Sequence, residues 1–561
     1  MVPDTYDAPM GDASTADDNL AAGRTALAQG AWADAHARLE RAVAAGAGPE
    51  ALEDLSWAAW WLDRVESCLE AREQAYLGYR ERGDTRSAAR MALWLGDDHL
   101  EFRGAGAVAQ GWFARAERLL DELEPCPEQG WLAVFEAHAA LRRAEPDVAI
   151  PLARRAQALG RNHDVVALEM FAVATEGVAQ VSQGEVQEGL RRLDEAATVA
   201  LSGEFEHLAA ASWTCCLMLS TCEHVRDLDR AGQWCRRVEE FSQRMGARFL
   251  RGVCRTHYGV IRAWQGDWRT ADRELVDALR TLGTERPSWR ADAVVRLGEL
   301  RRRQGRLEEA ASLFERSGVS GLRGLAALHL AGGRAVEARE LLERSLRHGP
   351  DGANPARADA LELLVRTLLA LGEYDAAGVR LEELRSIAEA AATDALRAAV
   401  DRSEGLLAAA TGASARACEH LEDAVDRLER SGAPVEAAVT RIELAEALNS
   451  VGRRDAAQRE AERALTALTE ADAGQERDRA AAILDALLAP ATPATERDQV
   501  LTPRQVQVLD LVARGLSDQQ IAEHLVLSRH TVHRHVANIY TRLGCSSRAE
   551  AVARATRLNL L

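Results

Sequence analysis

The sequence contains no lysine, so all 69 of its basic residues are arginine. A Walker A loop places a lysine on the β- and γ-phosphates of a nucleotide, and the absence of lysine excludes a P-loop ATPase within this chain. Schiff-base chemistry and the protein-kinase fold also depend on a lysine and are excluded for the same reason. An arginine-only, alanine-rich composition indicates a high-GC bacterial genome.

Long apolar runs and a basic leader segment are missing as well. No run approaches the roughly 20 apolar residues that cross a bilayer. Residues 1–18 are acidic and lack the basic-then-apolar order of a signal peptide, and we expect them to form a disordered tail. With 47% apolar residues and a formal net charge of -18, the rest is expected to be a soluble, cytoplasmic protein without a membrane partner.

The cysteines and histidines do not follow the spacing of a metal module. Their densest group consists of Cys215, Cys216, Cys222, Cys235 and Cys254, with His224 and His257 nearby. It contains no CxxC pair, so we expect reduced cysteines that pack in a core. No Ser-His-Asp or paired-carboxylate arrangement can be distinguished, because carboxylates are abundant and are expected mostly on solvated helix faces. We therefore predict no catalytic residue, no metal, no cofactor and no enzymatic activity.

The sequence does contain a spacing that recurs with a period near 40 residues. A helix-breaking residue is followed five positions later by alanine and seven positions after that by another small residue, as in Gly30, Ala35 and Ala42. The turn position falls at Gly30, Asp63, Gly104, Ala144, Gly184, Arg226, Gly266, Gly305, Gly333, Gly372, Gly412 and Gly452. Ten of the twelve residues five positions later are alanine, and the others are Cys68 and Gly189. Strand-like alternation never persists, so the pattern predicts an all-α fold built from helix pairs.

These small-residue offsets resemble those of the tetratricopeptide repeat (TPR) across residues 19–488. The usual period is 34 residues, and longer helices would account for the difference. The resemblance implies a TPR-like α-solenoid of about twelve helix-turn-helix repeats, with a long concave face that binds a protein, a peptide or a small-molecule effector. A scaffold or dimerisation platform is the alternative. Core packing is expected for most of the tryptophans at helical spacing or near turns, with one or two lining the groove: Trp57, Trp60, Trp61, Trp94 and Trp112.

Residues 489–499 interrupt the helical pattern with two prolines in a small, polar context and are predicted to form a linker. Beyond them the balance of charge inverts. Residues 500–561 contain eight arginines and four acidic residues, a formal charge of +4, which leaves -22 for the rest of the chain. A locally basic unit on an acidic chain is suited to an anionic partner.

Four short helices are predicted within residues 500–561. Capping boxes at residues 502–505, 517–520 and 547–550, together with Ser528, mark the four starts. Gly515 ends the first helix, the second reaches about Leu525, and Gly544 ends the third after Leu543. The turn of about three residues between the second and third helices is the spacing of a helix-turn-helix unit.

The third of these helices, which contains the sequence LSRHTVHRHV at residues 527–536, has two different faces. Its apolar residues are Val532, Val536, Ile539 and Leu543, and they are predicted to pack on Val508, Leu509, Ile521, Ala522 and Leu525. The opposite face carries His530, His533, Arg534, Ala537 and Thr541, with Thr531, His535 and Asn538 on a flank. One side is therefore expected to be buried and the other to present hydrogen-bond donors to solvent.

Three kinds of site could use this face. A metal site needs further ligands, and no carboxylate or cysteine joins the face. A catalytic base needs a nucleophile and a pocket, which a unit of four short helices does not offer. Arginine and imidazole donors within a basic unit match the acceptors of the DNA major groove and its flanking phosphates. The pattern thus favours DNA binding.

The run GLSDQQIAEHLVLSRHTVHRH, within a matching stretch of about 55 residues, resembles the LuxR-type helix-turn-helix domain. The resemblance implies that residues 528–543 enter the major groove of double-stranded DNA and that the fourth helix pairs two domains as a homodimer on DNA. The candidate DNA-binding residues on this helix are Ser528, Arg529, His530, Thr531, His533, Arg534, His535, Ala537, Asn538 and Arg542.

Two of these positions depart from the usual family pattern. The usual lysine is His533 here, and a position that is frequently basic is Ala537. Arg529, Arg534 and Arg542 partly restore the charge, so the groove assignment stands, although the preferred base sequence cannot be transferred. Because histidine changes charge within the physiological pH range, His533 raises the hypothesis that DNA binding depends on pH.

Together these features predict a cytoplasmic, nucleoid-associated bacterial transcriptional regulator. Residues 528–543 are its recognition helix, and ligand or protein binding to the solenoid controls the pairing of the tail domains. The alternative is a TPR-type adaptor or scaffold in which residues 500–561 are an accessory module.

Overall fold

The computed structural model describes residues 13–205, 207–489, 503–525, 529–543, 545 and 547–557. These residues form 29 α-helices and two short 3-10 helices, and no strand occurs among them. The chain divides into two compact units, Met1–Ile483 and Leu484–Leu561. The all-α fold predicted from the sequence is confirmed.

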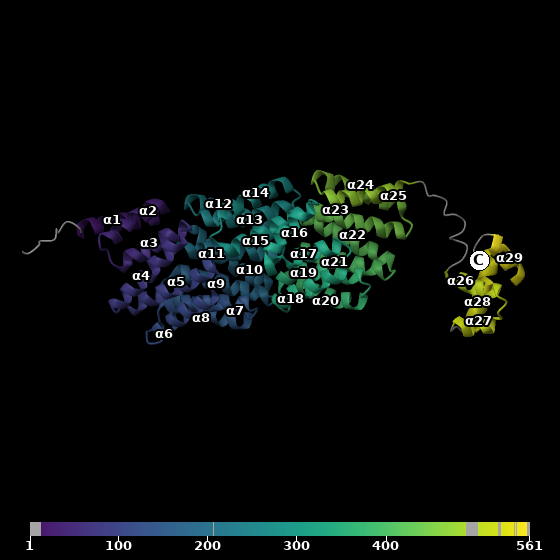
Figure 1. The fold of residues 1–561 in the computed structure, drawn as a ribbon, viewed down its shortest axis with the longest axis horizontal. Coiled ribbons are helices and arrows are strands. Elements are labelled where there is room, and N and C mark those ends of the chain that lie inside the picture. Colours follow the sequence, from purple (N-terminus) through teal and green to yellow (C-terminus); the bar gives the residue numbers. More distant parts are fainter. Residues whose placement is uncertain are drawn as a thin grey trace, which may run out of the picture. The chain divides into compact units, whose positions relative to one another are not determined.

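The larger unit is an α-solenoid whose helices follow one another in pairs (Figure 1). The first six pairs are α1 (Ala13–Ala28) and α2 (Trp32–Ala44), α3 (Pro49–Trp61) and α4 (Val65–Glu81), α5 (Thr85–Arg103) and α6 (Gly106–Leu120), α7 (Pro127–Arg142) and α8 (Pro146–Asn162), α9 (Val166–Ser182) and α10 (Val186–Ser202), and α11 (Leu208–His224) and α12 (Leu228–Arg244). The next six are α13 (Arg248–Trp264) and α14 (Trp268–Leu282), α15 (Pro287–Arg303) and α16 (Leu307–Arg316), α17 (Leu322–Ala331) and α18 (Ala335–His348), α19 (Ala358–Ala370) and α20 (Tyr374–Ala391), α21 (Asp394–Ala410) and α22 (Ser414–Arg430), and α23 (Pro434–Ser450) and α24 (Arg454–Glu470). The 3-10 helices η1 (Gly318–Gly321) and η2 (Pro355–Arg357) precede α17 and α19, and α25 (Gly474–Leu488) follows the last pair. The number of pairs agrees with the number of repeats predicted.

Each of the twelve predicted turn residues adopts a positive φ, including the non-glycine residues Asp63 (57°), Ala144 (60°) and Arg226 (54°). This left-handed conformation costs an L-residue about 1–2 kcal/mol, so packing of the flanking helices must hold these three turns. A second series of left-handed turns, which was not predicted from the sequence, connects one pair to the next and includes Gly83 and Asp164.

The small residues five positions after each turn lie where paired helices touch. Ala35, Ala271 and Ala417 have no exposed surface, and every other member of the set is buried. Gly189, an exception to alanine, shows why the position must be small. A Cβ at Gly189 would lie 2.4 Å from the carbonyl oxygen of Gly177 on the partner helix. The predicted close approach of the helices is confirmed.

The solenoid winds so tightly that turns far apart in sequence touch. The hydrogen bonds between such turns include those from Trp32 Nε1 to the Gly246 oxygen (3.2 Å), from Thr393 Oγ1 to the Val225 oxygen (2.8 Å) and from Trp264 Nε1 to the Ser431 oxygen (3.1 Å). The bonded residues are 214, 168 and 167 positions apart, which corresponds to about four to five repeats. These contacts hold turns of the solenoid together across several repeats, and the concave binding face expected from the sequence stays a prediction.

Aromatic rings fill the inner surface in the first half of the solenoid. The Trp94 ring lies between 5.0 and 6.1 Å, centre to centre, from the rings of Trp57, Trp131, Trp213 and His207. Trp60, Trp61 and Trp94 are buried as predicted, and Trp57 and Trp112 pack partly buried against the same core. The first half is therefore a packed core. Across the described ranges, no helix is long and apolar enough to cross a bilayer.

The cysteines also pack in this core, as predicted. Cys215, Cys216, Cys222, Cys235 and Cys254 are all buried free thiols. Burial raises the pKa of the Cys215 thiol to about 12. A thiol with so high a pKa is a poor nucleophile and a poor metal ligand at neutral pH.

The smaller unit contains α26 (Pro503–Ala513), α27 (Asp518–Leu525), α28 (Arg529–Leu543) and α29 (Arg548–Arg557). Their starts agree with the predicted capping signals, and Gly515 turns the chain after α26 with a φ of 84°. Residues 1–12, the linker residues 490–499, Thr502, Ser528 and Gly544 lie outside the described residues.

Candidate functional site

One apolar face holds α28 in the smaller unit. Its buried residues are Val532, Val536, Ile539 and Leu543, and they share a core with Val508, Leu509, Ile521, Ala522, Ala551 and Ala555, while Leu525 packs partly buried against it. This is the packing predicted from the sequence. Full burial of a large apolar side chain stabilises a fold by about 1.5–3 kcal/mol, so the four residues fix the direction of the opposite face.

The opposite face of α28 is open to solvent. The exposed residues are Arg529, His533, Arg534, Ala537 and Asn538, and His535 is half-buried. The sequence of α28 contains no Asp or Glu, so its exposed face is basic. His530, Thr531 and Arg542 belong to the same helix, but their side chains lie outside the described part of the unit.

The start of α27 is organised by the predicted capping box. The Ser517 backbone N–H donates to Gln520 Oε1 (2.9 Å), and the Gln520 N–H donates to Ser517 Oγ (3.4 Å). Such reciprocal bonds satisfy two backbone donors at the helix start. The box fixes the entry of α27 and therefore the helix that supports α28.

Two residues that the sequence analysis did not single out connect α29 and α28 to this helix start. Arg548 on α29 donates to the Leu516 oxygen (2.7 Å) and to Asp518 Oδ1 (2.6 Å). The other Asp518 oxygen lies 3.4 Å from His533 Nδ1. Asp518 thus joins the starts of α27 and α29 to the exposed face of α28, and Asp518 and Arg548 are positioning residues.

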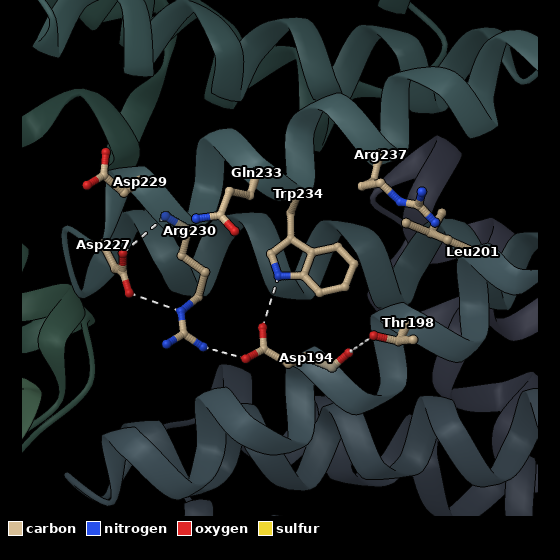
Figure 2. Close-up of a pocket in the computed structure, with 9 residues that line it drawn as sticks. All are labelled: Asp194, Thr198, Leu201, Asp227, Asp229, Arg230, Gln233, Trp234 and Arg237. Carbon is tan, nitrogen blue, oxygen red and sulfur yellow. Dashed lines mark hydrogen bonds and ion pairs between the residues drawn. The ribbon is translucent and has the colours of Figure 1, made fainter.

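A cleft on the solenoid surface is lined by α10, α12 and the turn before α12 (Figure 2). Its volume is about 570 Å³. Asp194 accepts hydrogen bonds from Trp234 Nε1 (2.9 Å) and from Arg230 (2.5 Å), and Arg230 also donates to Asp227 (3.0 Å). Since these charged groups already satisfy one another, their contacts hold α10 against α12.

One group in the solenoid has the geometry of metal ligands. Asp401, Glu404 and His420 each offer a ligand atom, and these atoms lie within 4.8 Å of one another. Arg427 donates to Asp401 (2.6 Å), and Arg385 donates to Glu404. Because guanidinium groups already bind both carboxylates, we interpret the group as an ion-pair network.

A third set of charged groups, which joins α11, α13 and α15, makes stability sensitive to acid. Glu223 on α11 lies 2.8 Å from His257 Nδ1 and forms an ion pair with Arg296. Burial by itself would raise the pKa of the Glu223 carboxyl, but Arg296 and His257 outweigh it and lower this pKa to about 2. The ionised carboxylate therefore stabilises the folded state above the pKa of an unfolded glutamate, about 4.3.

We expect Glu223→Gln to lower the urea midpoint of unfolding at pH 7. On acidification, the midpoint of this variant is expected to decrease less than that of the wild type. The stabilisation by Glu223 is complete at neutral pH and is lost as the pH falls from about 4.3 towards 2. The midpoint is measured by circular dichroism between pH 7 and pH 3. Glu343→Gln on α18, where the carboxylate is 44% exposed, is the control and is expected to behave like the wild type. Identical pH profiles of Glu223→Gln and wild type would contradict the assignment.

Comparison with known families agrees with the geometry of the smaller unit. Residues 499–555 match the family described as "Bacterial regulatory proteins, luxR family". The C-terminal unit is a LuxR-type helix-turn-helix domain. The resemblance of the sequence motif to this family is confirmed, and the match covers about a tenth of the chain.

Curated relatives share one short segment with this chain. The HTH-type transcriptional regulator MalT of Yersinia pestis (strain Pestoides F) is 42% identical over 69 residues, which are 12% of this chain and 8% of that protein. MalT of Serratia proteamaculans (strain 568) is 41% identical over 69 residues, with the same two shares. The likeness therefore spans less than a tenth of the length of these relatives.

Two solved structures resemble the chain more broadly at low identity. One is described as the APC/C hetero-tetramer Cut9-Hcn1, with 14% identity and a TM-score of 0.42 over 84% of this chain and 96% of that chain. The other is a Rap protein complexed with competence and sporulation factor, with 13% identity and a TM-score of 0.37 over 68% of this chain and 98% of that chain. The larger unit is a solenoid by its own helix pairs and turns.

Both departures of the LuxR-type domain from the usual family residues lie on the exposed face of α28. The His533 side chain is 75% exposed, and Ala537 is also exposed. Arg529 and Arg534, which were expected to restore charge, are exposed on the same helix. The pH dependence of DNA binding through His533 stays a prediction.

Proposed function

We propose that the protein is a bacterial transcriptional regulator whose LuxR-type domain, at residues 500–561, binds double-stranded DNA through α28. The observation that carries this proposal is a basic, solvent-exposed helix face fixed by the apolar core on its other side. Exposed arginine and imidazole donors suit base edges and phosphates of the major groove. The ten residues of the recognition helix named from the sequence remain the proposed DNA-binding set.

In this proposal the solenoid, residues 19–488, receives a regulatory signal. A small molecule, a peptide or a protein would bind it and change the self-association of the chain or the availability of the domain, while residues 489–499 serve as the linker. Two domains would pair on DNA as a homodimer and contact half-sites about one helical turn apart. A cytoplasmic, nucleoid-associated location follows from binding to chromosomal DNA.

We expect Arg534→Ala to weaken binding to a selected duplex by about 1–3 kcal/mol, roughly 5- to 150-fold, if Arg534 reaches a base edge. The duplex is obtained by selection from a random pool with the full chain, and affinity is measured by fluorescence anisotropy at fixed salt. The variant is expected to lose discrimination between the selected duplex and a random one, because a base contact specifies sequence.

Arg514→Ala is the matched control. Arg514 lies just beyond α26, its side chain is 66% exposed, and it pairs with Asp510 at 2.6 Å. Its replacement removes the same charge from the domain but is expected to affect both duplexes equally and weakly. Equal losses for the two variants would show that Arg534 acts only through its charge. A wild-type chain that ignores all duplexes at low ionic strength would favour the alternative function, an adaptor or scaffold.

A further inference from the structure

The second half of the solenoid encloses a cavity of about 590 Å³. Its lining comes from the odd-numbered helices α11 to α25, with further residues from α12, α14 and α22. The cavity lies within the larger unit, beyond the aromatic core of the first half. A volume of this size is typical of a site for a small molecule.

The cavity wall is rich in charged side chains of both signs. Eight arginines line it: Arg226, Arg296, Arg302, Arg303, Arg323, Arg366, Arg402 and Arg479. Six carboxylates line it: Glu223, Glu299, Asp359, Glu362, Glu436 and Glu476. Glu443 and Glu446 pair with two of these arginines from behind the wall, so the charges around the cavity balance and the arrangement of the individual pairs decides which donors are available.

Seven of the eight arginines have a carboxylate oxygen within 3.3 Å. The pairs are Arg226 with Glu362, Arg296 with Glu223, Arg302 with Glu299, Arg303 with Glu436, Arg323 with Asp359, Arg402 with Glu443 and Arg479 with Glu446. These pairs use most of the carboxylates of the wall, so the donors of the paired arginines are largely committed.

Arg366 on α19 differs from the other seven. Its closest carboxylate oxygen is Glu443 Oε1, at 3.7 Å, and that oxygen already accepts a hydrogen bond from Arg402 at 2.7 Å. The neighbouring Arg402 guanidinium lowers the pKa of Arg366, and burial lowers this pKa further. Within the described residues, no carboxylate lies within hydrogen-bond distance of the Arg366 side chain. Its side chain is 35% exposed, so an anion in the cavity can reach its donors.

Apart from Gln475, the remaining wall is mainly apolar. It includes Trp264, Leu330, Leu363, Leu428 and Val439. A ligand that filled the cavity would cover these side chains as well as the guanidinium of Arg366. Inorganic anions would satisfy the charge but leave the apolar wall uncovered, and neutral apolar molecules would leave the donors of Arg366 unpaired.

We propose that this cavity is the effector site of the solenoid and that its ligand is a small organic anion, with a carboxylate, sulfonate or phosphate bound by Arg366 and an apolar body against the tryptophan-leucine wall. The proposal rests on the regulatory role proposed above, because a ligand of this cavity is an effector only if the solenoid controls the DNA-binding domain. Binding itself depends only on the cavity, so it is tested without DNA.

The test uses the full chain and two fluorescent probes with the same ring system. 8-Anilinonaphthalene-1-sulfonate carries a sulfonate, and N-phenyl-1-naphthylamine is its neutral counterpart. We expect wild type to bind the sulfonate at one site, and Arg366→Gln to weaken this binding about tenfold or more, because a charge-assisted contact is lost. Binding of the neutral probe is expected to be weak and unchanged. Arg347→Gln on α18, where the side chain is 67% exposed, is the control and should change neither titration.

A second measurement needs no variant and so does not depend on the folding of Arg366→Gln. In wild type, 1-naphthoate is expected to displace the sulfonate probe, whereas the neutral 1-naphthamide is not. Equal displacement by both compounds, or unchanged affinity of a folded Arg366→Gln chain, would overturn the anion site. DNA affinity of the same wild-type sample is measured separately, so failure of the cavity proposal is distinguishable from failure of DNA binding.

Discussion

Replacing Arg286 with methionine is expected to destabilise the contact between successive turns of the solenoid by about 3–5 kcal/mol. Arg286 precedes α15 and has no exposed surface. It donates to Asp63 Oδ1 (2.8 Å), to Glu101 and to the Trp60 oxygen (3.1 Å). These bonds join positions up to 226 residues apart, so this one guanidinium connects α15 to helices several repeats earlier.

The expected effect is large because the substitution leaves the carboxylates of Asp63 and Glu101 without their guanidinium donor. The guanidinium carbon also lies 4.1 Å from the centre of the Trp60 ring and 4.2 Å from that of Phe249. Methionine can fill much of this space, but it cannot donate to the two carboxylates. Burial raises the pKa of Glu101 and Arg286 opposes that rise, so without Arg286 the carboxylate is either unpaired or protonated. Both outcomes weaken the folded state at neutral pH.

Hydrogen exchange of the native chain gives a local measure of this effect. Peptides from α3, α5 and α15 are expected to lose protection in Arg286→Met, while peptides from α26 to α29 are expected to remain unchanged. The control is Arg280→Met on α14, whose side chain is 75% exposed and pairs with Asp277 at 2.9 Å. Exposed pairs contribute about 0–1 kcal/mol, so little change is expected there. Equal protection in the two variants would contradict the role of Arg286.

Val508→Asp is expected to unfold the LuxR-type domain while leaving the solenoid folded. Val508 has no exposed surface and lies in the core shared by α26, α27, α28 and α29. An unpaired carboxylate in such a core costs several kcal/mol, and a domain this small has a total stability of only about 5 kcal/mol. DNA binding is expected to disappear with the fold, because the direction of α28 depends on this core.

The neighbouring position provides the control for Val508→Asp. Gln507 is exposed on the same helix, so Gln507→Asp introduces the same charge without burying it. Hydrogen exchange of residues 503–557 and of α1 to α24 is measured for both variants. Loss of protection confined to the domain is expected for Val508→Asp alone. If residues 503–557 kept their protection in the Val508→Asp variant, the core would not be what holds α28.

The first series of turns could be predicted because it has a strict sequence register. Each helix pair needs a residue in the left-handed conformation and then a small residue five positions later. The small residue is visible in the sequence even where the turn residue is Asp63 or Arg226. The second series lacks this register. The second helix of a pair varies from 10 residues in α16 to 18 in α20, so the distance between the two turns of a repeat is not constant.

The tight winding of the solenoid could not be predicted, since it depends on small angles between successive pairs that no local motif records. The change from an aromatic interior in the early repeats to a charged interior in the later repeats could have been predicted from the spacing of the turns. The residue ten positions before the turn is Trp94 in the third repeat but Arg323, Glu362 and Arg402 in the ninth to eleventh. The general expectation that carboxylates occupy solvated faces is wrong at Glu443, which is 4% exposed and bound by Arg402.

The two faces of α28 were predicted closely because burial of one face follows directly from the spacing of Val532, Val536 and Ile539. The contacts of Asp518 with Arg548 and His533 were not predicted, because they join three helices and depend on how these pack. These contacts place a carboxylate beside the exposed, basic face of α28.

Methylation interference on the selected duplex tests most directly whether α28 reads the major groove. Dimethyl sulfate modifies N7 of guanine in the major groove and N3 of adenine in the minor groove, and N7 is an acceptor that an arginine would contact. If α28 lies in the major groove, guanine N7 methylation within the recognised sequence blocks binding of the full chain and adenine N3 methylation there does not. Binding that tolerates methylation at every guanine N7, or is blocked only at adenine N3, would contradict the assignment of α28 as the recognition helix.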